Sequence, residues 1–180
     1  MMCARPRIVF CVAALLLLLS SAIGQRGREP LTEVEINQLR DTAMEPDLRL
    51  KLYVTFARAR LDAVEKASSD PKVTDRSQET RDRLQDFLDV YDELNDNIDT
   101  FVGRKADLRK PLKAIIEADT EFQAKLRALK DSADTNKDET QKYEFLLSNT
   151  IETIDTSVPD HRQLLEEQEA AAKNKKKEKP

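Results

Sequence analysis

Residues 46–67 read PDLRLKLYVTFARARLDAVEKA, and their apolar side chains fall on two faces of one predicted helix. At about 100° per residue, the first face holds Leu50, Val54, Ala57, Leu61 and Val64. The second face, on nearly the opposite side, holds Leu52, Phe56, Ala59 and Ala63. A helix with one apolar stripe lies on a surface, whereas two broad apolar faces need partners on both sides. We therefore expect this segment to be the central helix of a bundle.

The composition of the chain indicates an all-α fold. Its 180 residues include 3 glycines and no tryptophan, and 36% of them are charged. Proteins rich in β-hairpins need many more glycines in their turns, while abundant Leu, Ala, Glu and Lys suit amphipathic helices. We predict an up-down bundle of roughly four to six helices.

The first 24 residues have the pattern of a secretory signal peptide. Two arginines precede an uninterrupted apolar run at residues 8–19, and small residues follow it. The run is too short to span about 30 Å of hydrocarbon. We therefore expect cleavage after Ala22 or Gly24, and a protein that is periplasmic or extracellular.

Cysteine usage agrees with an exported protein that folds without disulfides. Cys3 and Cys11 both lie in the predicted signal peptide, so the mature chain would have no thiol chemistry. Residues 25–31 are predicted to form a flexible lead, 32–172 a single helical domain, and 173–180 a disordered basic tail.

Prolines and capping signals divide the domain into helices. Proline is favoured in the first turn of a helix. Capping-box spacing, Thr or Ser followed three residues later by Glu or Asp, occurs at Thr32 with Glu35, Thr135 with Asp138 and Ser157 with Asp160. The predicted helices lie near residues 32–44, 46–67, 75–102, 111–132, 137–156 and 159–172.

One of these boundaries conflicts with the apolar spacing. From Leu84 to Leu129 a 3,4 spacing continues across Gly103 and Pro111, as a single long coiled-coil helix would require. An interior proline costs about 3 kcal/mol and a glycine about 1 kcal/mol relative to alanine. We therefore expect a break or strong kink within 103–111, although one kinked helix remains the alternative.

The predicted helix 75–102 has an acidic face opposite its apolar face. Its carboxylates follow a 4,3 spacing: Asp75, Glu79, Asp82, Asp86, Asp89, Glu93 and Asp96. This acidic face is a candidate surface for a basic partner or for divalent cations; the alternative is a solvated outer face. A calcium site needs about six to eight oxygens around one point. Because a straight helix directs its carboxylates apart, we expect only weak cation binding.

Two basic segments lie far apart in the sequence. One contains Arg104, Lys105, Arg109, Lys110 and Lys113, and the other is the tail KNKKKEKP at residues 173–180. The tail could fold back on the acidic face, touch an anionic envelope surface, or only increase solubility. Nucleic-acid binding is not expected, because the chain has a net charge of −4 at pH 7 and the first segment lacks interleaved aromatic residues.

Asp119 occupies an apolar position in the 3,4 spacing of its own helix. An unpaired buried carboxylate is costly, and Arg60 projects between the two apolar faces of the central helix. We predict a buried pair of Arg60 and Asp119 that fixes the register of the helices, with Arg49 or Arg58 as alternative partners. A kink at Pro111 could instead rotate Asp119 outward.

The sequence contains no pattern typical of an enzyme. His161 is the single histidine, whereas catalytic triads and zinc sites require additional partners. Val158 stands where a di-iron Glu-x-x-His motif would place its glutamate. We expect His161 to lie beside Leu164 and Leu165 on a half-buried face, and we expect no catalytic residues, cofactor or metal ligands.

In character, the chain resembles small periplasmic chaperones of the Spy and CpxP kind, in which an LTxxQ motif recurs. Residues 31–35 read LTEVE and depart from that motif at the last position. The resemblance would imply an exported helical chaperone with a concave apolar surface for unfolded clients. A capping box at Thr32 and Glu35 accounts for the same residues.

These observations favour an exported, non-enzymatic protein that acts in envelope interaction or structure. A periplasmic chaperone or stress protein and a weak divalent-cation binder are the alternatives. A protein partner of unknown identity is compatible with the sequence, whereas nucleic acid and stable membrane insertion after signal cleavage are not expected. The heptad spacing also permits dimers formed through helices.

Overall fold

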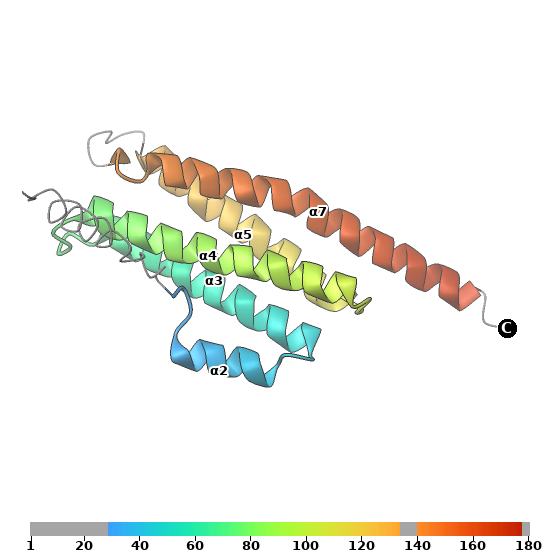
Figure 1. Ribbon diagram of the computed structural model, residues 1–180. Helices are drawn as coiled ribbons and strands as arrows, with labels where there is room; N and C mark the ends of the chain where they lie inside the picture. Colours follow the sequence, from blue (N-terminus) through green and yellow to red (C-terminus); the bar gives the residue numbers. More distant parts are fainter. Residues whose placement is uncertain (1–28, 134–139, 178–180) are drawn as a thin grey trace, which may run out of the picture.

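Helices are the only regular structure in the residues that the computed structural model describes, 29–133 and 140–177 (Figure 1). They are α2 (Glu33–Asp41), α3 (Pro46–Ser69), α4 (Arg76–Gly103), α5 (Arg109–Ala133) and α7 (Glu144–Lys177). The predicted all-α bundle is therefore confirmed. The predicted signal peptide at 1–24 lies outside the described residues.

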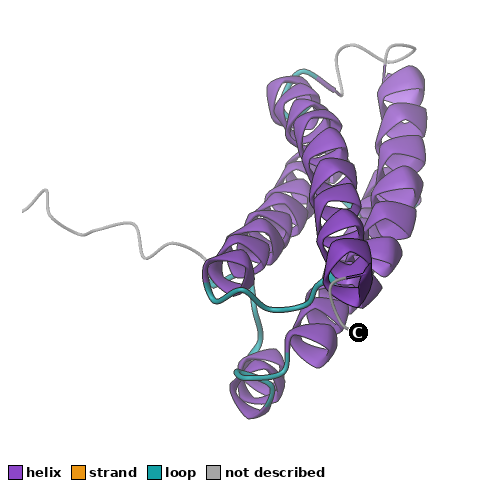
Figure 2. Ribbon diagram, turned by 90° about the vertical axis from the view of Figure 1, so that its right-hand side faces the viewer, coloured by secondary structure: helices purple, strands orange, loops and turns teal. Residues whose placement is uncertain are grey.

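The four long helices form a bundle of alternating chain direction (Figures 1 and 2). Helix α3 packs mainly against α4 and α5 mainly against α7, while the α3–α5 and α4–α7 seams join the two pairs. The short helix α2 lies outside the bundle against α3. No helix in the described part of the chain is both long and apolar enough to cross a bilayer.

The two faces predicted for the central helix have different partners. On the first face, Leu50, Ala57 and Val64 are fully buried in the core of the bundle. On the second face, Phe56 is buried and Leu52 is half-buried. Arg49 and Arg60, on either side of Phe56 in the chain, bind α2, so the small helix rather than another long one lies beside this face. The cover is partial, since Ala63 is half-buried and Ala59 is exposed.

Aromatic rings fill the centre of the bundle. Phe122 of α5 lies edge-on to Phe87 and Tyr91 of α4, with ring centroids 5.3 Å and 6.2 Å away. Such edge-to-face pairs add about 0.5–1.5 kcal/mol each to the burial of apolar area. These contacts join α4 to α5 across the core.

The expected break within 103–111 is confirmed, since α4 ends at Gly103 and α5 begins at Arg109. The N–H of Ala106 donates to the carbonyl of Phe101, and that of Lys105 donates to the carbonyl of Val102. This pair of bonds is the Schellman pattern that ends helices. Lys105 adopts the left-handed conformation that the pattern requires, with φ of 59°.

The predicted break before Pro159 is wrong. Helix α7 continues from Glu144 to Lys177 with Pro159 inside it. Ser157, predicted to cap a new helix, instead donates its hydroxyl to the carbonyl of Thr153 one turn earlier. The cost of an interior proline, about 3 kcal/mol, is offset because Ile154 and Val158 stay buried along one continuous face.

Helix α7 also begins later and ends further along the chain than predicted. It includes residues 173–177 of the predicted disordered tail, and 178–180 lie outside the described residues. The predicted cap at Thr135 and Asp138 likewise falls outside them.

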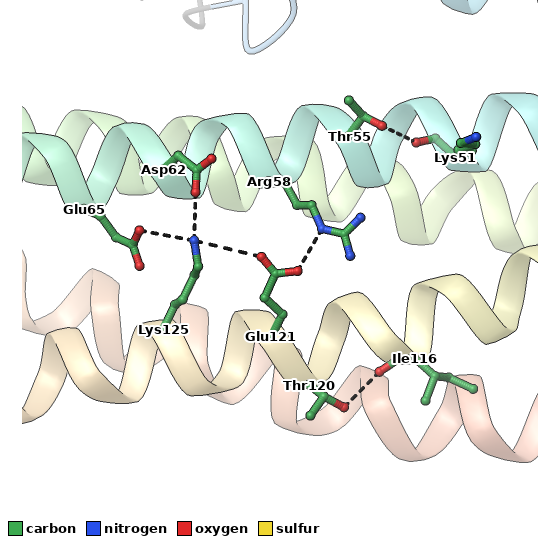
Figure 3. Close-up of polar contacts among 9 residues, drawn as sticks. All are labelled: Lys51, Thr55, Arg58, Asp62, Glu65, Ile116, Thr120, Glu121 and Lys125. Atoms are coloured by element: carbon green, nitrogen blue, oxygen red, sulfur yellow. Dashed lines mark hydrogen bonds and ion pairs between the residues drawn. The ribbon is translucent and has the colours of Figure 1, made fainter.

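A row of charges joins α3 to α5 (Figure 3). The ammonium of Lys125 on α5 lies 2.8 Å from Asp62 and 3.2 Å from Glu65 on α3. Beside it, Arg58 of α3 donates to Glu121 of α5 at 2.8 Å. Hydrogen bonds to Asp62 and Glu65 raise the pKa of Lys125. This seam is polar where it meets solvent, whereas the residues behind it are apolar.

Candidate functional site

The buried polar groups of the bundle gather around Asp119, whose side chain is fully buried. Tyr91 of α4 donates its hydroxyl to Asp119 Oδ1 at 2.9 Å. His161 of α7 places Nδ1 2.8 Å from Asp119 Oδ2, and its Nε2 lies 3.1 Å from Asn95 Oδ1. This Tyr91–Asp119–His161–Asn95 network joins α4, α5 and α7 in the core.

The hydrogen bonds around Asn95 indicate how the protons are arranged. The amide nitrogen of Asn95 donates to the hydroxyl of Ser157, which itself donates to a backbone carbonyl. Asn95 therefore presents its oxygen to His161, and Nε2 must carry a proton. The remaining contact, between Nδ1 and Asp119, needs one more proton, carried either by the imidazole or by the carboxyl group. Either way, the pair has no net charge.

The hydrogen-bonding groups of this network are satisfied within the protein. Across the described residues, every buried side-chain nitrogen or oxygen has a hydrogen-bond partner. Burial and the adjacent Asp119 carboxylate raise the pKa of Tyr91 well above its ordinary value, so its hydroxyl stays a donor. Asn95, Ser157 and His161 border a groove of about 300 Å³ between α4 and α7. The ring nitrogens of His161 are both occupied, so this arrangement suits a structural role better than proton transfer to a ligand.

The predicted pair of Arg60 and Asp119 is wrong, although the predicted burial of Asp119 is confirmed. Arg60 points to the other side of α3 and binds Glu35 and the carbonyl of Pro30. The alternative partners are also engaged elsewhere, Arg49 by Asn97 and Arg58 by Glu121. Arg60 projects toward the second face of α3, whereas α5 packs on its first face, so the two side chains cannot meet.

His161 is the residue that the sequence prediction missed. It is buried, 5% exposed, rather than half-buried. Its position could have been found from the spacing of Leu147, Ile151, Ile154, Val158, His161 and Leu165, which is a continuous 4,3 pattern. Placing a helix break before Pro159 concealed that pattern.

The predicted acidic face of α4 is divided by the packing. Asp86 is buried and contacts Arg83, which also pairs with Glu79. Asp75 caps α4 through the N–H of Gln78 and pairs with Lys142 of the neighbouring segment. These three acidic residues are thus engaged within the protein.

Of the other predicted acidic residues, Asp82 and Asp89 are half-buried, and Glu93 and Asp96 are exposed. Asp82 and Asp89 accept from glutamines on α4, and Glu93 accepts from Tyr53 at 3.5 Å. Burial and the nearby Asp89 and Asp96 raise the pKa of Asp92 beside them. No three His, Cys, Asp or Glu residues in the described ranges converge as metal ligands would.

The two basic segments, by contrast, meet at one end of the bundle, where α4 ends, α5 begins and α7 projects beyond both (Figure 1). Lys105, Arg109 and Lys175 border one depression there, and Arg109, Lys110 and Lys113 border another. We call this surface the basic end; it comprises Arg104, Lys105, Arg109, Lys110, Lys113, Lys173 and Lys175.

Acidic residues neutralise only part of the basic end. Lys110 pairs with Asp47, Lys113 with Glu169 and Arg109 with Asp107. Hydrogen bonds from Arg109 lower the pKa of Asp107 to about 2. Lys175 and Lys173 lie near enough to help lower the pKa values of Asp107 and Glu169, although neither forms a direct ion pair with them. Among the described residues, no acidic side chain pairs with Lys105.

Hydrogen bonds of Gln168 hold the two basic segments together. Gln168 of α7 accepts from the N–H of Leu108 at 2.7 Å and donates to the carbonyl of Ala106 at 3.2 Å. These bonds attach the C-terminal part of α7 to the α4–α5 connection. Lys173 and Lys175 are thus held near the cations of residues 104–113.

Comparison of the chain with known protein families, with curated proteins and with solved structures gave no match.

Proposed function

We propose that the protein is an exported, non-enzymatic helical-bundle protein that acts in envelope interaction or structure, and that it docks through its basic end on an anionic partner. The observation that carries this proposal is the meeting of two basic segments, about 60 residues apart in the chain, at one end of the bundle. The Tyr91–Asp119–His161–Asn95 network supports the non-enzymatic part of this proposal, because its titratable groups are all hydrogen-bonded to one another between three helices.

Charge distribution favours a directed contact. The chain as a whole is acidic, with a net charge of −4 at pH 7, so its overall charge does not attract an anionic partner. At the basic end the cations outnumber the neighbouring Asp47, Asp107, Glu117 and Glu169. Opposite charges attract over about 8–10 Å at physiological salt, so the molecule approaches an anion with this end first.

A sulfonate cation-exchange resin tests the docking. A protein of net negative charge passes through such a resin at pH 7 unless a local basic surface binds it. We expect the folded protein to be retained and to elute with salt. Removing charge by Lys105→Gly, or by Lys173→Gln with Lys175→Gln, should lower the salt needed for elution.

The matched controls are Lys72→Gln and Lys130→Gln, which remove exposed cations at the opposite end of the bundle. Both should elute as the unmodified protein does. Flow-through of the unmodified protein, or equal effects at the two ends, would refute the proposed docking surface. The expectation of export is tested separately by sequencing the N-terminus of the mature protein.

A further inference from the structure

We infer that the anionic partner is a lipid bilayer surface, on which the bundle stands with its basic end against the headgroups. This inference rests on the proposed function and specifies its partner. It is carried by a second observation at the same end, the exposure of apolar side chains among the cations.

Large exposed apolar side chains are few in the described residues, and most of them lie at the basic end. Met44 is 81% exposed in the turn before α3, and Leu48 is 48% exposed in the first turn of α3. Val102, 38% exposed, lies in the last turn of α4 beside Arg104 and Lys105. The remaining two are Val34 and Phe145.

Contacts place these apolar residues next to the cations. Asp47, between Met44 and Leu48 in the chain and close to both, binds the ammonium of Lys110 at 3.0 Å. Leu48 and Lys110 border the same groove between α3 and α5. Apolar side chains beside lysines match a bilayer surface, in which phosphates lie above the acyl boundary.

The conformation of Lys105 adds a further argument. This residue occupies the left-handed position of the Schellman turn, where glycine is preferred, at φ of 59°. A side chain there carries backbone strain. Its ammonium forms no ion pair with an acidic side chain among the described residues. No such contact within the protein therefore offsets the backbone strain. A contact outside the protein accounts for a cation at this position.

The distribution of the cations favours a lipid surface over an acidic polypeptide or a nucleic acid. They come from the α4–α5 connection, the first turns of α5 and the end of α7, and they border three adjoining depressions instead of a single groove. Most are lysines, which bind phosphates as point charges, whereas arginine provides bidentate recognition. The exposed Asp92, Glu93 and Asp96 of α4 disfavour contact of that side of the bundle with an anionic surface, which favours end-on contact.

Vesicle flotation tests the inference with two compositions, pure phosphatidylcholine and equal parts of phosphatidylcholine and phosphatidylglycerol. We expect binding to the anionic vesicles only, and release at high ionic strength. Each cation near such a surface contributes a factor of about five in affinity. Lys105→Gly should therefore weaken binding about fivefold, and Lys173→Gln with Lys175→Gln by more than tenfold.

A matched pair of variants tests the contribution of the apolar side chains to vesicle binding. Met44→Ser should weaken vesicle binding at least severalfold, because the thioether side chain no longer enters the headgroup region. Phe145→Ser removes a larger and equally exposed apolar side chain at the opposite end, 86% exposed, and should leave binding unchanged. Circular dichroism is the check that both variants are folded. Equal losses for the two variants would overturn end-on docking.

A soluble acidic polymer, polyglutamate, distinguishes the partners. If the protein binds polyglutamate and the sulfonate resin but neither vesicle, the lipid inference fails while the anion-docking function stands. If it binds none of them, both fail. Binding to phosphatidylcholine as strong as to anionic vesicles would also overturn the inference, since the cations would then contribute nothing.

Discussion

The guanidinium of Arg60 on α3 lies 2.6 Å from the carboxylate of Glu35 on α2, and both side chains are mostly buried, 17% and 13% exposed. Near the other end of α3, Arg49 donates to the carbonyl of Leu39 at the end of α2. Leu39 is the single buried side chain of α2. Two arginines therefore hold the two ends of a helix that has little apolar attachment of its own.

Acid pH should detach α2. Burial raises the pKa of Glu35, but hydrogen bonds from Arg60 and Thr32 outweigh it and hold the pKa below its ordinary value of 4.5. A carboxyl group with a lowered pKa stabilises the fold fully above its unfolded-state pKa, and the contribution disappears as the pH falls through the folded-state value. At pH values under about 4.5, the α2 amides should therefore lose hydrogen-exchange protection relative to the α4 amides.

Glu35→Gln provides the control for this pH dependence. The variant keeps a polar side chain but has no charge for Arg60, so the α2 amides should be less protected at neutral pH. Their protection should then be insensitive to acid. If α2 in the variant loses protection over the same pH range as the unmodified protein, another group is responsible.

The core network should couple Asp119 to His161. His161→Leu leaves Asp119 buried without its main partner, and breaking a buried pair in this way costs about 3–5 kcal/mol of unfolding free energy. Replacing both residues by leucine removes the orphaned group, so the double variant should be destabilised by less than the sum of the single changes. Urea unfolding of the four proteins measures this difference, and strict additivity would show that the two residues do not act as a pair.

Local patterns predicted those parts of the fold that depend on short-range spacing. The two faces of α3 follow from the positions of its apolar residues, and the end of α4 follows from Gly103 and Pro111. The burial of Asp119 was likewise visible, because it interrupts a continuous apolar stripe. Its partners were not, since Tyr91 and His161 lie 28 and 42 residues away in the chain.

The two prolines in continuous apolar spacings show the limit of such patterns. Pro111 lies in the first turn of α5, where its missing N–H needs no partner. Pro159 also lies in a continuous apolar spacing, but it is inside α7. Tertiary packing decides which of the two prolines breaks a helix. Val158 before Pro159 and His161 after it are both buried, so the helix continues past the proline. The meeting of the two basic segments also depends on this uninterrupted helix.

Pro159→Ala should stabilise the protein. Proline is exposed here and removes one backbone hydrogen bond from the helix interior, at a cost of up to about 3 kcal/mol relative to alanine. We expect an increase in unfolding free energy of roughly 1–3 kcal/mol, measured by urea denaturation. Thr156→Ala, an exposed change one turn away, is the control and should have a much smaller effect. A loss of stability in Pro159→Ala would show that the proline makes packing contacts worth more than the missing bond.

Lys105→Gly should stabilise the fold although it removes a charge. Lys105 has φ of 59°, and a non-glycine residue in this conformation costs about 1–2 kcal/mol. Glycine relieves that strain and keeps both hydrogen bonds of the turn, so the midpoint of urea unfolding should rise. Gly103→Ala is the companion variant, because an added Cβ at residue 103 meets nothing within 4 Å and alanine is favoured within a helix. If Gly103→Ala raises the midpoint while Lys105→Gly lowers it, the Lys105 side chain stabilises the fold itself. A more stable Lys105→Gly protein that binds anionic vesicles less tightly would instead show that this residue is kept for a contact outside the molecule.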